Sequence, residues 1–325
     1  MSMDLLLSVL ADGEFHSGEE LGAALGVSRA AVWKQIKKIE SLLGFELESV
    51  SGKGYRIAGG LELLDRVSVL EGLSATVRER LSDFEVLSVV GSTNRVVMER
   101  AAAGVEPGYL CAAEKQTAGR GRRGRIWHSP FGKNLYFSLS WQFSGGAASL
   151  EGLSLAIGVA VNEVLDGMGI QGVQLKWPND LLYKNKKLAG ILLEMAGDAS
   201  GVCQVVIGVG INVDMGGADR ETIDQPWTDL KKITERPVSR NVLLATLIEK
   251  LVRLLGAYEE QGFKAYRARW LAMDAFTDQS VQLLIGQRVI EGVASGVDES
   301  GGLQICVDGQ LQLFNGGEIS LRKLK

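Results

Sequence analysis

The chain has 325 residues, of which 46% are hydrophobic and 23% charged, a composition typical of a folded protein with two or three domains. Lys and Arg number 35 against 39 Asp and Glu, so the formal net charge is -4. This balance excludes a uniformly basic nucleic-acid coat protein, and any contact with nucleic acid has to come from a local patch.

Cysteine usage and the N-terminal sequence indicate a soluble cytoplasmic protein. Cys111, Cys203 and Cys306 are far apart and odd in number, so neither a disulfide framework nor a zinc ribbon is expected. Asp4 lies where a signal peptide would carry positive charge. No apolar run approaches the ~20 residues needed to cross a bilayer, the nearest being residues 202–213. We therefore expect no membrane partner.

Residues 1–62 predict three short helices followed by a hairpin. Ser17 and Glu20 have capping-box spacing at the start of the second helix, which stops at Gly26. Ser28 caps a third helix with apolar residues at helical spacing. Two helices joined by a short turn, with a two-stranded wing after them, predict a winged helix-turn-helix DNA-binding domain whose third helix enters a major groove.

The charge of this head leaves two interpretations open. Residues 1–60 hold six basic and eight acidic residues, so a solvated helix face in a protein-interaction module is the alternative to DNA binding. DNA binding is favoured because all six cations fall on the third helix or the wing. The residues expected to contact DNA are Ser28, Arg29, Lys34, Lys37 and Lys53.

Beyond a linker at residues 59–66, the pattern changes to strands and helices. Helices are expected at 149–169 and 239–262, and strands at 86–90, 109–116, 134–143, 173–177, 187–195 and 202–213. Without a strict repeating βα unit, these runs predict an α+β domain with a mixed sheet over residues 63–272. Residues 273–325 contain short apolar segments separated by Gly and Asp. This pattern is typical of short strands and predicts a small SH3-like β-barrel.

The most distinctive segment is residues 115–133, which contain six Lys or Arg and no acid. Within it Arg120, Arg122, Arg123 and Arg125 alternate with glycines, so we expect a loop that is mobile until an anion binds. Guanidinium groups on such a backbone suit a carboxylate and phosphates. A disordered RNA-binding Gly-Arg stretch is the alternative, disfavoured because strand-like sequence lies on both sides.

Two further segments place polar groups at the ends of expected elements. Ser92, Thr93 and Asn94 lie at a strand-to-helix junction, where they cap the helix or offer hydroxyls and an amide to a ligand. Lys176 ends a strand before the turn at residues 177–180. That turn is ordinary hairpin chemistry taken alone, but it places Lys176 at the mouth of the sheet.

A fourth segment contains glycines inside a strand. Gly208 and Gly210 precede Asn212 and leave room for a ligand to approach the backbone. The loop that follows ends in Trp227, whose indole either stacks on a nucleotide base or packs structurally. With only two histidines in the chain, Ser-His-Asp and zinc-histidine chemistries are poorly supported, which leaves electrostatic stabilisation as the catalytic route.

Four of these segments together resemble the bifunctional biotin protein ligases that also repress the biotin operon of bacteria. They are GSTN at 91–94, GRGRRGR at 119–125, KWPND at 176–180 and GVGIN at 208–212. The resemblance covers almost the whole chain, including the DNA-binding head. A lipoate-type ligase and a biotin-sensing repressor without catalysis remain alternatives.

The resemblance implies an ATP-dependent, AMP-forming ligase. Biotin carboxylate attacks the α-phosphate of ATP, accompanied by Mg²⁺, to give biotinyl-5'-AMP and pyrophosphate. A lysine of the biotin carboxyl carrier protein of acetyl-CoA carboxylase then attacks the mixed anhydride. The resemblance also implies that the adenylate-bound protein forms a homodimer, which binds operator DNA and represses transcription.

The residue roles follow from the matching positions. Those that match biotin- or adenylate-binding positions of the family are Ser92, Thr93, Asn94, Gln116, Arg120, Gly121, Arg122 and Lys176. Arg122 and Lys176 are expected to be catalytic, because they place positive charge where the carboxylate and the α-phosphate react. Asn212 and Trp227 are expected to bind ATP, and Asp180 to orient Lys176 or the incoming lysine.

Overall fold

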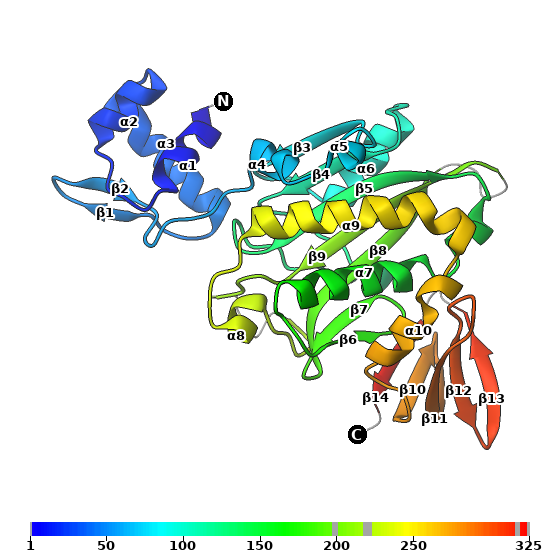
Figure 1. Cartoon of the computed structure of the whole chain (residues 1–325). Helices are drawn as coiled ribbons and strands as arrows, with labels where there is room; N and C mark the ends of the chain where they lie inside the picture. The colour runs from blue at the N-terminus through cyan, green and yellow to red at the C-terminus, as the bar shows by residue number, and fades with distance from the viewer. Residues whose placement is uncertain (1, 197–200, 217–222, 316–318, 324–325) are drawn as a thin grey trace.

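The computed structural model describes residues 2–196, 201–216, 223–315 and 319–323 (Figure 1). A small helical head, a central sheet with its helices and a C-terminal antiparallel sheet follow one another along the chain and in space (Figure 1). This arrangement agrees with the predicted α+β class.

The head has the predicted winged helix-turn-helix arrangement. Its elements are α1 (Ser2–Leu10), α2 (Gly18–Leu25), α3 (Arg29–Leu43), β1 (Glu48–Val50) and β2 (Gly54–Arg56). The capping box of Ser17 and Glu20 forms as predicted, and Ser28 caps α3 by accepting a hydrogen bond from the amide of Ala31. Val32, Ile36 and Ile39 turn inward from α3 into a hydrophobic core that belongs to the head.

The centre of the molecule is a seven-stranded mixed sheet with the order β3-β4-β5-β9-β8-β7-β6. Its strands are β3 (Asp83–Leu87), β4 (Tyr109–Ala113), β5 (Leu135–Phe143), β6 (Val173–Lys176), β7 (Asp180–Tyr183), β8 (Lys186–Ala196) and β9 (Cys203–Ile211). Only the β3–β4 pair is parallel. Long antiparallel pairing between β5, β9 and β8 forms the rigid floor on which the site is built.

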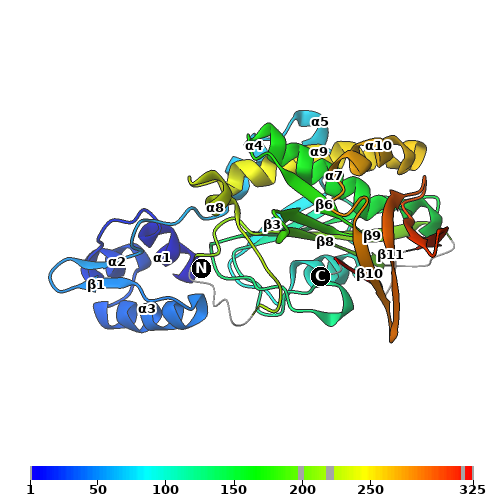
Figure 2. The same ribbon diagram turned by 90° about the horizontal axis from the view of Figure 1, so that it is seen from below.

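Helices cover the two faces of this sheet unequally. The apolar helices α7 (Leu153–Gly167) and α9 (Arg240–Gln261) pack on one face, and α6 (Thr93–Ala102) lies on the other (Figure 2). The shorter helical segments are α4 (Arg66–Glu71), α5 (Ala75–Arg78), η1 (Arg122–Gly124), η2 (Ala147–Leu150), α8 (Leu230–Thr234) and α10 (Lys264–Met273). Because α6 covers only part of its face, the rest is open to a ligand.

Some of these elements differ from the sequence expectations. The expected strand at 86–90 lies instead at Asp83–Leu87, and β7 and the short helices α4, α5, α8 and α10 were not expected. The segment Ala148–Gly167 also contradicts the expectation that no apolar run is long enough for a membrane, since its mean hydropathy is 1.4. Of its most apolar 18-residue window, 61% is buried inside the protein. Core helices of folded proteins reach the same length and hydropathy, so these two properties alone do not indicate a membrane-spanning segment.

The C-terminal part is a five-stranded antiparallel sheet with the order β13-β12-β11-β10-β14. Its strands are β10 (Ser280–Ile285), β11 (Arg288–Val297), β12 (Leu303–Val307), β13 (Gln310–Phe314) and β14 (Ile319–Lys323). Its inward side chains, such as Leu283 and Leu303, share one hydrophobic cluster with the central domain. Trp177 crosses between the two parts and donates to the carbonyl of Gly301 at 3.0 Å.

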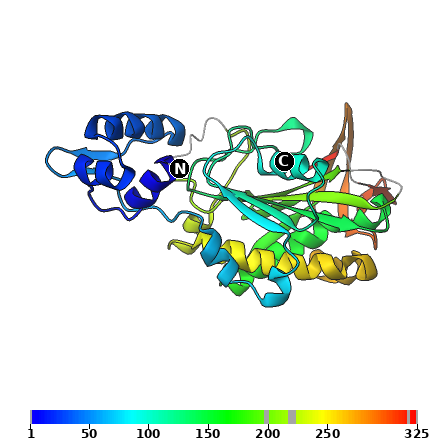
Figure 3. The ribbon, with the colours of Figure 1, turned by 90° about the horizontal axis from the view of Figure 1, so that it is seen from above.

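The head lies beside the central domain (Figure 3). A few side chains connect the two. Phe131, which follows the arginine loop, is 1% exposed and belongs to the core of the head. The Lys115 ammonium group donates to the carbonyl of Leu42 near the C-terminus of α3, and Ser88 donates to Asp4 of α1. The head is therefore attached to both ends of the segment that carries the arginines.

Candidate active site

A cavity of about 310 Å³ opens on the α6 side of the central sheet. Strands β5, β8 and β9 form its floor, and loop residues between 120 and 128 form its walls together with the β6–β7 hairpin. All eight residues predicted to bind biotin or its adenylate line this cavity. Segments that are up to 84 residues apart in the sequence, from Ser92 to Lys176, thus meet in one place.

A buried polar network forms at the N-terminus of α6. Gln116 Oε1 accepts hydrogen bonds from the amide of Thr93 at 2.9 Å and from its hydroxyl at 3.2 Å. Asn94 Nδ2 donates to Glu194 Oε2 at 2.8 Å, and its Oδ1 accepts from the hydroxyl of Ser138 at 2.6 Å. These partners hold the three side chains before any ligand arrives, which reduces the entropy lost on binding.

Ser92 has a different role from the helix cap that its position suggests. It occupies the N-cap position of α6, yet its side chain makes no capping hydrogen bond. The side chain is 3% exposed and lines the cavity. Of the two uses open to this residue, the geometry therefore favours contact with a ligand over capping.

The strand glycines receive a protein side chain, which refines the expectation that they leave room for a ligand. Gly190 and Gly210 are cross-strand partners in the β8–β9 ladder. A Cβ atom on Gly210 would lie 2.6 Å from the indole of Trp127, and one on Gly190 would lie 3.1 Å from it. Similarly, a Cβ on Gly208 would collide with Asn94. The indole is seated on the glycine pair and forms part of the cavity wall.

The arginine loop folds back on itself as a narrow turn. An isolated bridge pairs Arg120 with Ile126, and the amide of Gly121 donates to the carbonyl of Arg125 at 2.7 Å. Arg120 forms an ion pair with Glu194 at 3.1 Å, and Arg122 donates to Asn179 Oδ1 at 3.3 Å. Both arginines thereby face the cavity. That the loop is mobile until an anion binds stays a prediction.

Three charged groups lie together at the β6–β7–β8 corner of the cavity. Lys176 and Asp180 are register partners across the hairpin, and Asp180 forms an ion pair with Lys187 at 2.7 Å. Burial lowers the pKa of Lys176, and the nearby Asp180 carboxylate opposes this effect. Burial also lowers the pKa of Arg122, again opposed by Asp180. The carboxylate therefore favours the charged forms of the two cations.

Sequence reasoning missed two residues of this site. Lys187 lines the cavity, and its ammonium group also lies 5.3 Å from the ring centre of Trp127. The two residues are Lys187 and Trp127, and neither has a local signature. Lys187 follows a basic turn that is typical of a surface, and a lone Trp is typical of a core. A signal existed in Gly210, whose place inside a strand indicated a close approach without saying by what, whereas its cross-strand partner Gly190 was not singled out.

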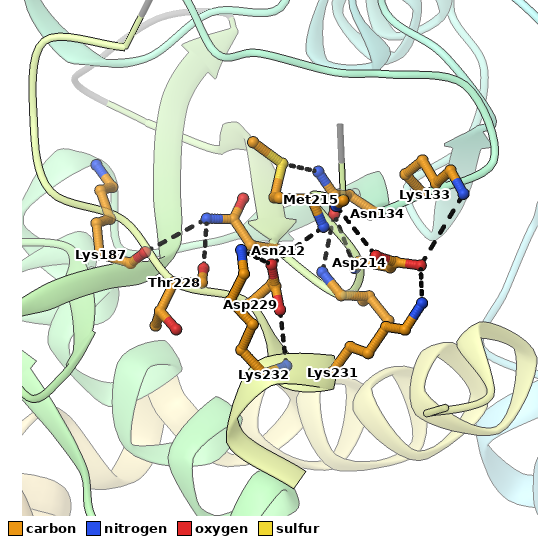
Figure 4. A network of polar contacts seen from close by, with 12 residues as sticks. Lys133, Asn134, Lys187, Asn212, Asp214, Met215, Thr228, Asp229, Lys231 and Lys232 are labelled. Carbon is orange, nitrogen blue, oxygen red and sulfur yellow. Dashed lines mark hydrogen bonds and ion pairs between the residues drawn. The ribbon is translucent and has the colours of Figure 1, made fainter. Parts of the chain in front are cut away.

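Asn212 and Trp227 lie outside the lining of this cavity. Asn212 Nδ2 donates to the carbonyls of Lys187 at 3.3 Å and Thr228 at 3.0 Å (Figure 4). Asp229 accepts from the amide of Met215 at 3.2 Å and caps α8 (Figure 4). These bonds fasten both ends of the segment between β9 and α8, of which residues 217–222 lie outside the described part of the chain.

Trp227 belongs to a second hollow of about 450 Å³ next to the first. The two share residues 223–225. Lys232 lies 4.0 Å above the centre of the Trp227 ring, and Lys186 completes a basic rim. An aromatic face with an ammonium group above it, in a hollow that a second lysine also lines, suits a nucleotide better than an apolar ligand.

The residues expected to contact DNA lie on the surface of the head. Ser28 and Arg29 are exposed at the start of α3, and Lys34 and Lys37 are exposed along its next two turns. Lys53 is exposed at the tip of the wing. Lys37 is paired with Glu40 at 2.7 Å, and Lys53 lies 5.8 Å above the ring of Phe15. Across the described ranges, no group of three or more His, Cys, Asp or Glu is arranged to hold a metal ion.

Comparison with known families divides the chain into three matched regions. Residues 3–56 match a helix-turn-helix domain model, and residues 86–212 match the biotin/lipoate A/B protein ligase family. Residues 276–322 match the C-terminal domain of biotin protein ligases. These regions correspond to the head, the central sheet with its cavity, and the C-terminal sheet.

Curated relatives extend over nearly the full chain. The bifunctional ligase/repressor BirA of Salmonella typhimurium is 44% identical, with 98% of this chain and 96% of the relative covered. The protein of the same name from Escherichia coli is 42% identical with the same coverage. Among solved structures, the biotin protein ligase of Aquifex aeolicus in complex with biotin and ATP has a TM-score of 0.66 and 30% identity, and covers 74% of this chain and 99% of that one.

Proposed function

The chain belongs to the biotin protein ligase family, as a ligase that also carries a helix-turn-helix repressor head, and on this premise we propose how its residues carry out the reaction. It is an ATP-dependent biotin ligase, and the proposed acceptor is a lysine of the biotin carboxyl carrier protein of acetyl-CoA carboxylase. The observation that carries the assignment of residues is the cavity that gathers the polar network of α6, the arginine loop and Lys176.

Biotin occupies the part of the cavity between α6 and the indole of Trp127. The hydroxyls of Ser92 and Thr93 and the amides of Asn94 and Gln116 match the donors and acceptors of a ureido group. Trp127 and the β8–β9 floor enclose the apolar remainder. The biotin carboxylate then points toward the β6–β7–β8 corner of the cavity, called the cationic corner below because of its lysines. Attraction to this positive charge fixes the direction of the carboxylate.

Adenylation is a positioning and electrostatic problem. A carboxylate oxygen of biotin forms a bond to the α-phosphorus of ATP while the bond from that phosphorus to the bridging oxygen breaks, releasing pyrophosphate. Two anions have to approach each other, so cations that are already in place lower the barrier most. Arg122 and Lys176 supply this charge, and Lys187, held by Asp180, extends it. No covalent enzyme intermediate is needed.

Transfer to the acceptor uses the same corner. The neutral amine of the acceptor lysine attacks the acyl carbon of the mixed anhydride, and the bond from this carbon to the phosphate oxygen breaks. AMP leaves, and the proton lost by the amine nitrogen passes to solvent. Arg122 and Lys176 stabilise the departing phosphate. Because Asp180 is already paired with Lys187, we assign it to orienting Lys187 in place of the alternatives expected from the sequence.

The nucleotide extends from the cationic corner into the hollow beside Trp227. The indole covers the adenine, and Lys186 and Lys232 lie near the phosphates. Asn212 supports this site indirectly through the carbonyl of Thr228. Mg²⁺ arrives bound to the phosphates of ATP, the usual way in which this ion is held in nucleotide sites.

Repression follows from the head. Binding of the adenylate favours a homodimer whose two heads contact the two half-sites of a palindromic operator. Both ends of the arginine-loop segment contact the head, which supports a link between ligand and DNA. The cytoplasm is the proposed location, since ATP, the acceptor and the operator DNA are found there in bacteria.

The test of the enzyme is incubation with ATP, Mg²⁺, labelled biotin and an acceptor domain. Label on the acceptor lysine is expected, together with one AMP and one pyrophosphate for each biotin transferred. Lipoate accepted in place of biotin would favour the lipoate-type ligase. Biotin binding without label on the acceptor would favour a sensor without catalysis.

The test of the head is removal of residues 1–60. The truncated chain should lose operator binding and substantially retain adenylate synthesis, because the cavity lies on the central sheet, whose hydrophobic core is separate from that of the head. Its stability should fall, since Phe131 loses its cover. Operator affinity equal to that of the full chain would refute the assignment of the head.

A further inference from the structure

The head exposes a tryptophan on its recognition helix. Trp33 lies in the first two turns of α3 and is 52% exposed. An exposed large aromatic side chain is informative, because tryptophan is highly buried on average. Its neighbour Val32 is fully buried in the core of the head, so the helix is firmly seated and the exposure of Trp33 is not the result of a loose domain.

Trp33 shares its side of the helix with cations. Val32, Ile36 and Ile39 define the inward face of α3. At 100° per residue, Trp33 lies on the flank of α3 between its inward and outward sides, one helical turn before Lys37 and next to Lys34. Both lysines are exposed. An indole flanked by ammonium groups, in the part of a recognition helix that meets base edges, faces the major groove when the helix docks on DNA.

The head has few cations available to bind DNA phosphates, so an apolar contact with a base would contribute more to its affinity for DNA. Residues 1–60 carry six cations and eight acids, and two of these cations are already paired, Lys37 with Glu40 and Arg56 with Glu48. Affinity from phosphate neutralisation grows with the number of free cations. A head with few of them depends more on contacts to the bases themselves.

We propose that Trp33 is a specificity-determining residue of the head, and that its indole packs against the methyl group of a thymine in the major groove. The thymine C5-methyl is the apolar group that the major groove presents, and it distinguishes a T·A pair from the other pairs. The indole has a single N–H donor and no acceptor, so its principal contact with a base edge is apolar. This inference rests on the proposed DNA-binding function of the head.

The experiment uses the full chain in the presence of biotin and Mg²⁺-ATP. Duplexes that bind are first selected from a library of randomised DNA, and the thymines of the selected duplex are then replaced one at a time by deoxyuridine, which removes only the methyl group. At one position in each half-site, the replacement should weaken binding by the wild-type chain about fourfold, the effect of one buried methyl group.

The same duplexes are measured with the Trp33→Ala variant. It should bind the selected duplex about tenfold more weakly, as expected for the loss of a well-packed base contact. It should be indifferent to deoxyuridine at the position that the wild type reads. The dependence of affinity on salt should be unchanged, because no phosphate contact is lost. Trp33→Phe, which keeps an apolar aromatic ring, should restore part of the affinity.

Two controls separate apolar readout from charge and from general damage. Lys34→Ala should weaken binding to every duplex and reduce the salt slope by about one. Leu5→Ala removes an apolar side chain of the same head that is 45% exposed, but on α1, and should leave DNA binding unchanged. Adenylate synthesis should be equal in all variants, which reports an intact catalytic domain.

The outcomes distinguish this inference from the function on which it rests. If the wild-type chain retains no duplex from the library, the DNA-binding function fails. If the wild type selects a duplex but Trp33→Ala binds it equally well, or remains sensitive to the same thymine methyl, the role of Trp33 is refuted. A loss of affinity that is equal for selected and random duplexes also refutes it, and indicates a contact between the two heads.

Discussion

Asp180 forms an ion pair with Lys187 at 2.7 Å, and the two side chains are only 15% and 16% exposed. The carboxylate also lies opposite Lys176 in the hairpin register and favours the charged forms of Lys176 and Arg122. A single negative charge thus offsets the repulsion among three cations. This explains how the protein keeps so much positive charge in one corner before an anionic substrate arrives.

Replacement of this carboxylate should therefore disturb the whole corner. In Asp180→Asn, Lys187 loses its partner, and the free energy of unfolding should fall by about 1–3 kcal/mol. Adenylate formation should slow, because Lys187 is no longer held. Glu99→Gln breaks the ion pair with Arg95 on the surface of α6 and should change stability by less than about 0.5 kcal/mol. Equal losses in the two variants, measured by urea unfolding, would contradict a special role for Asp180.

The pH dependence of adenylate formation should report Lys176. Because burial lowers the pKa of this lysine, the rate should decline on the alkaline side at a lower pH than an ordinary lysine would cause. Lys176→Arg stays charged and should move this decline to higher pH, even if the maximum rate is lower. An alkaline limb that is the same in both proteins would show that another group titrates.

The contribution of Lys176 to stability should rise with pH, whereas its contribution to activity falls. A lysine whose pKa is lower in the folded state releases its proton more easily there than in the unfolded chain. The unfolded state binds more protons between the two pKa values, so the free energy of unfolding gains from this group as the pH rises through that window. The comparison with Lys176→Met, by urea unfolding at several pH values, measures this gain. A loss of activity with rising pH is then not caused by unfolding at this site.

Arg122 should govern how long the adenylate stays bound. Arg122→Ala removes a guanidinium group that faces the cavity beside Asn179. Charge-assisted hydrogen bonds contribute about 1.5–3 kcal/mol, so the adenylate should dissociate about ten- to a hundredfold faster. Arg95→Ala, an arginine that is 73% exposed on α6, is the matched control. Stopped-flow dissociation that is unchanged in Arg122→Ala would remove the main catalytic assignment.

Lys115 should connect the biotin pocket with the DNA-binding head. Its ammonium group binds the carbonyl of Leu42 near the C-terminus of α3, and the next residue, Gln116, holds Thr93 in the pocket. A cation at a helix C-terminus stabilises it by about 0.3–1 kcal/mol. In Lys115→Ala, amide hydrogen exchange in the last turn of α3 should be faster, while Lys264→Ala, exposed at 72%, should have no effect there. Unchanged exchange in α3 would contradict the contact.

Local features of the sequence were enough to predict much of the fold. The caps of α2 and α3, the periodicity of α7 and α9 and the long strands β5, β8 and β9 depend on residues that are near one another in the chain. The short elements were harder, since β7 has only four residues and α10 has a weak apolar pattern. Their stability comes from packing on β8 and α7, which no local pattern reveals.

For the site, the sequence by itself determined the chemical groups. The glycine-rich arginine loop, the polar residues before α6 and Lys176 were recognisable because each is an unusual local combination. The tertiary structure alone decided how they are arranged. The pairing of Asp180 with Lys187, the seat of Trp127 on Gly190 and Gly210, and the attachment of Lys115 to α3 join segments whose spacing in the sequence carries no signal. Such contacts depend on strand register and on the folding of distant segments against one sheet, so they exist only once the chain has folded.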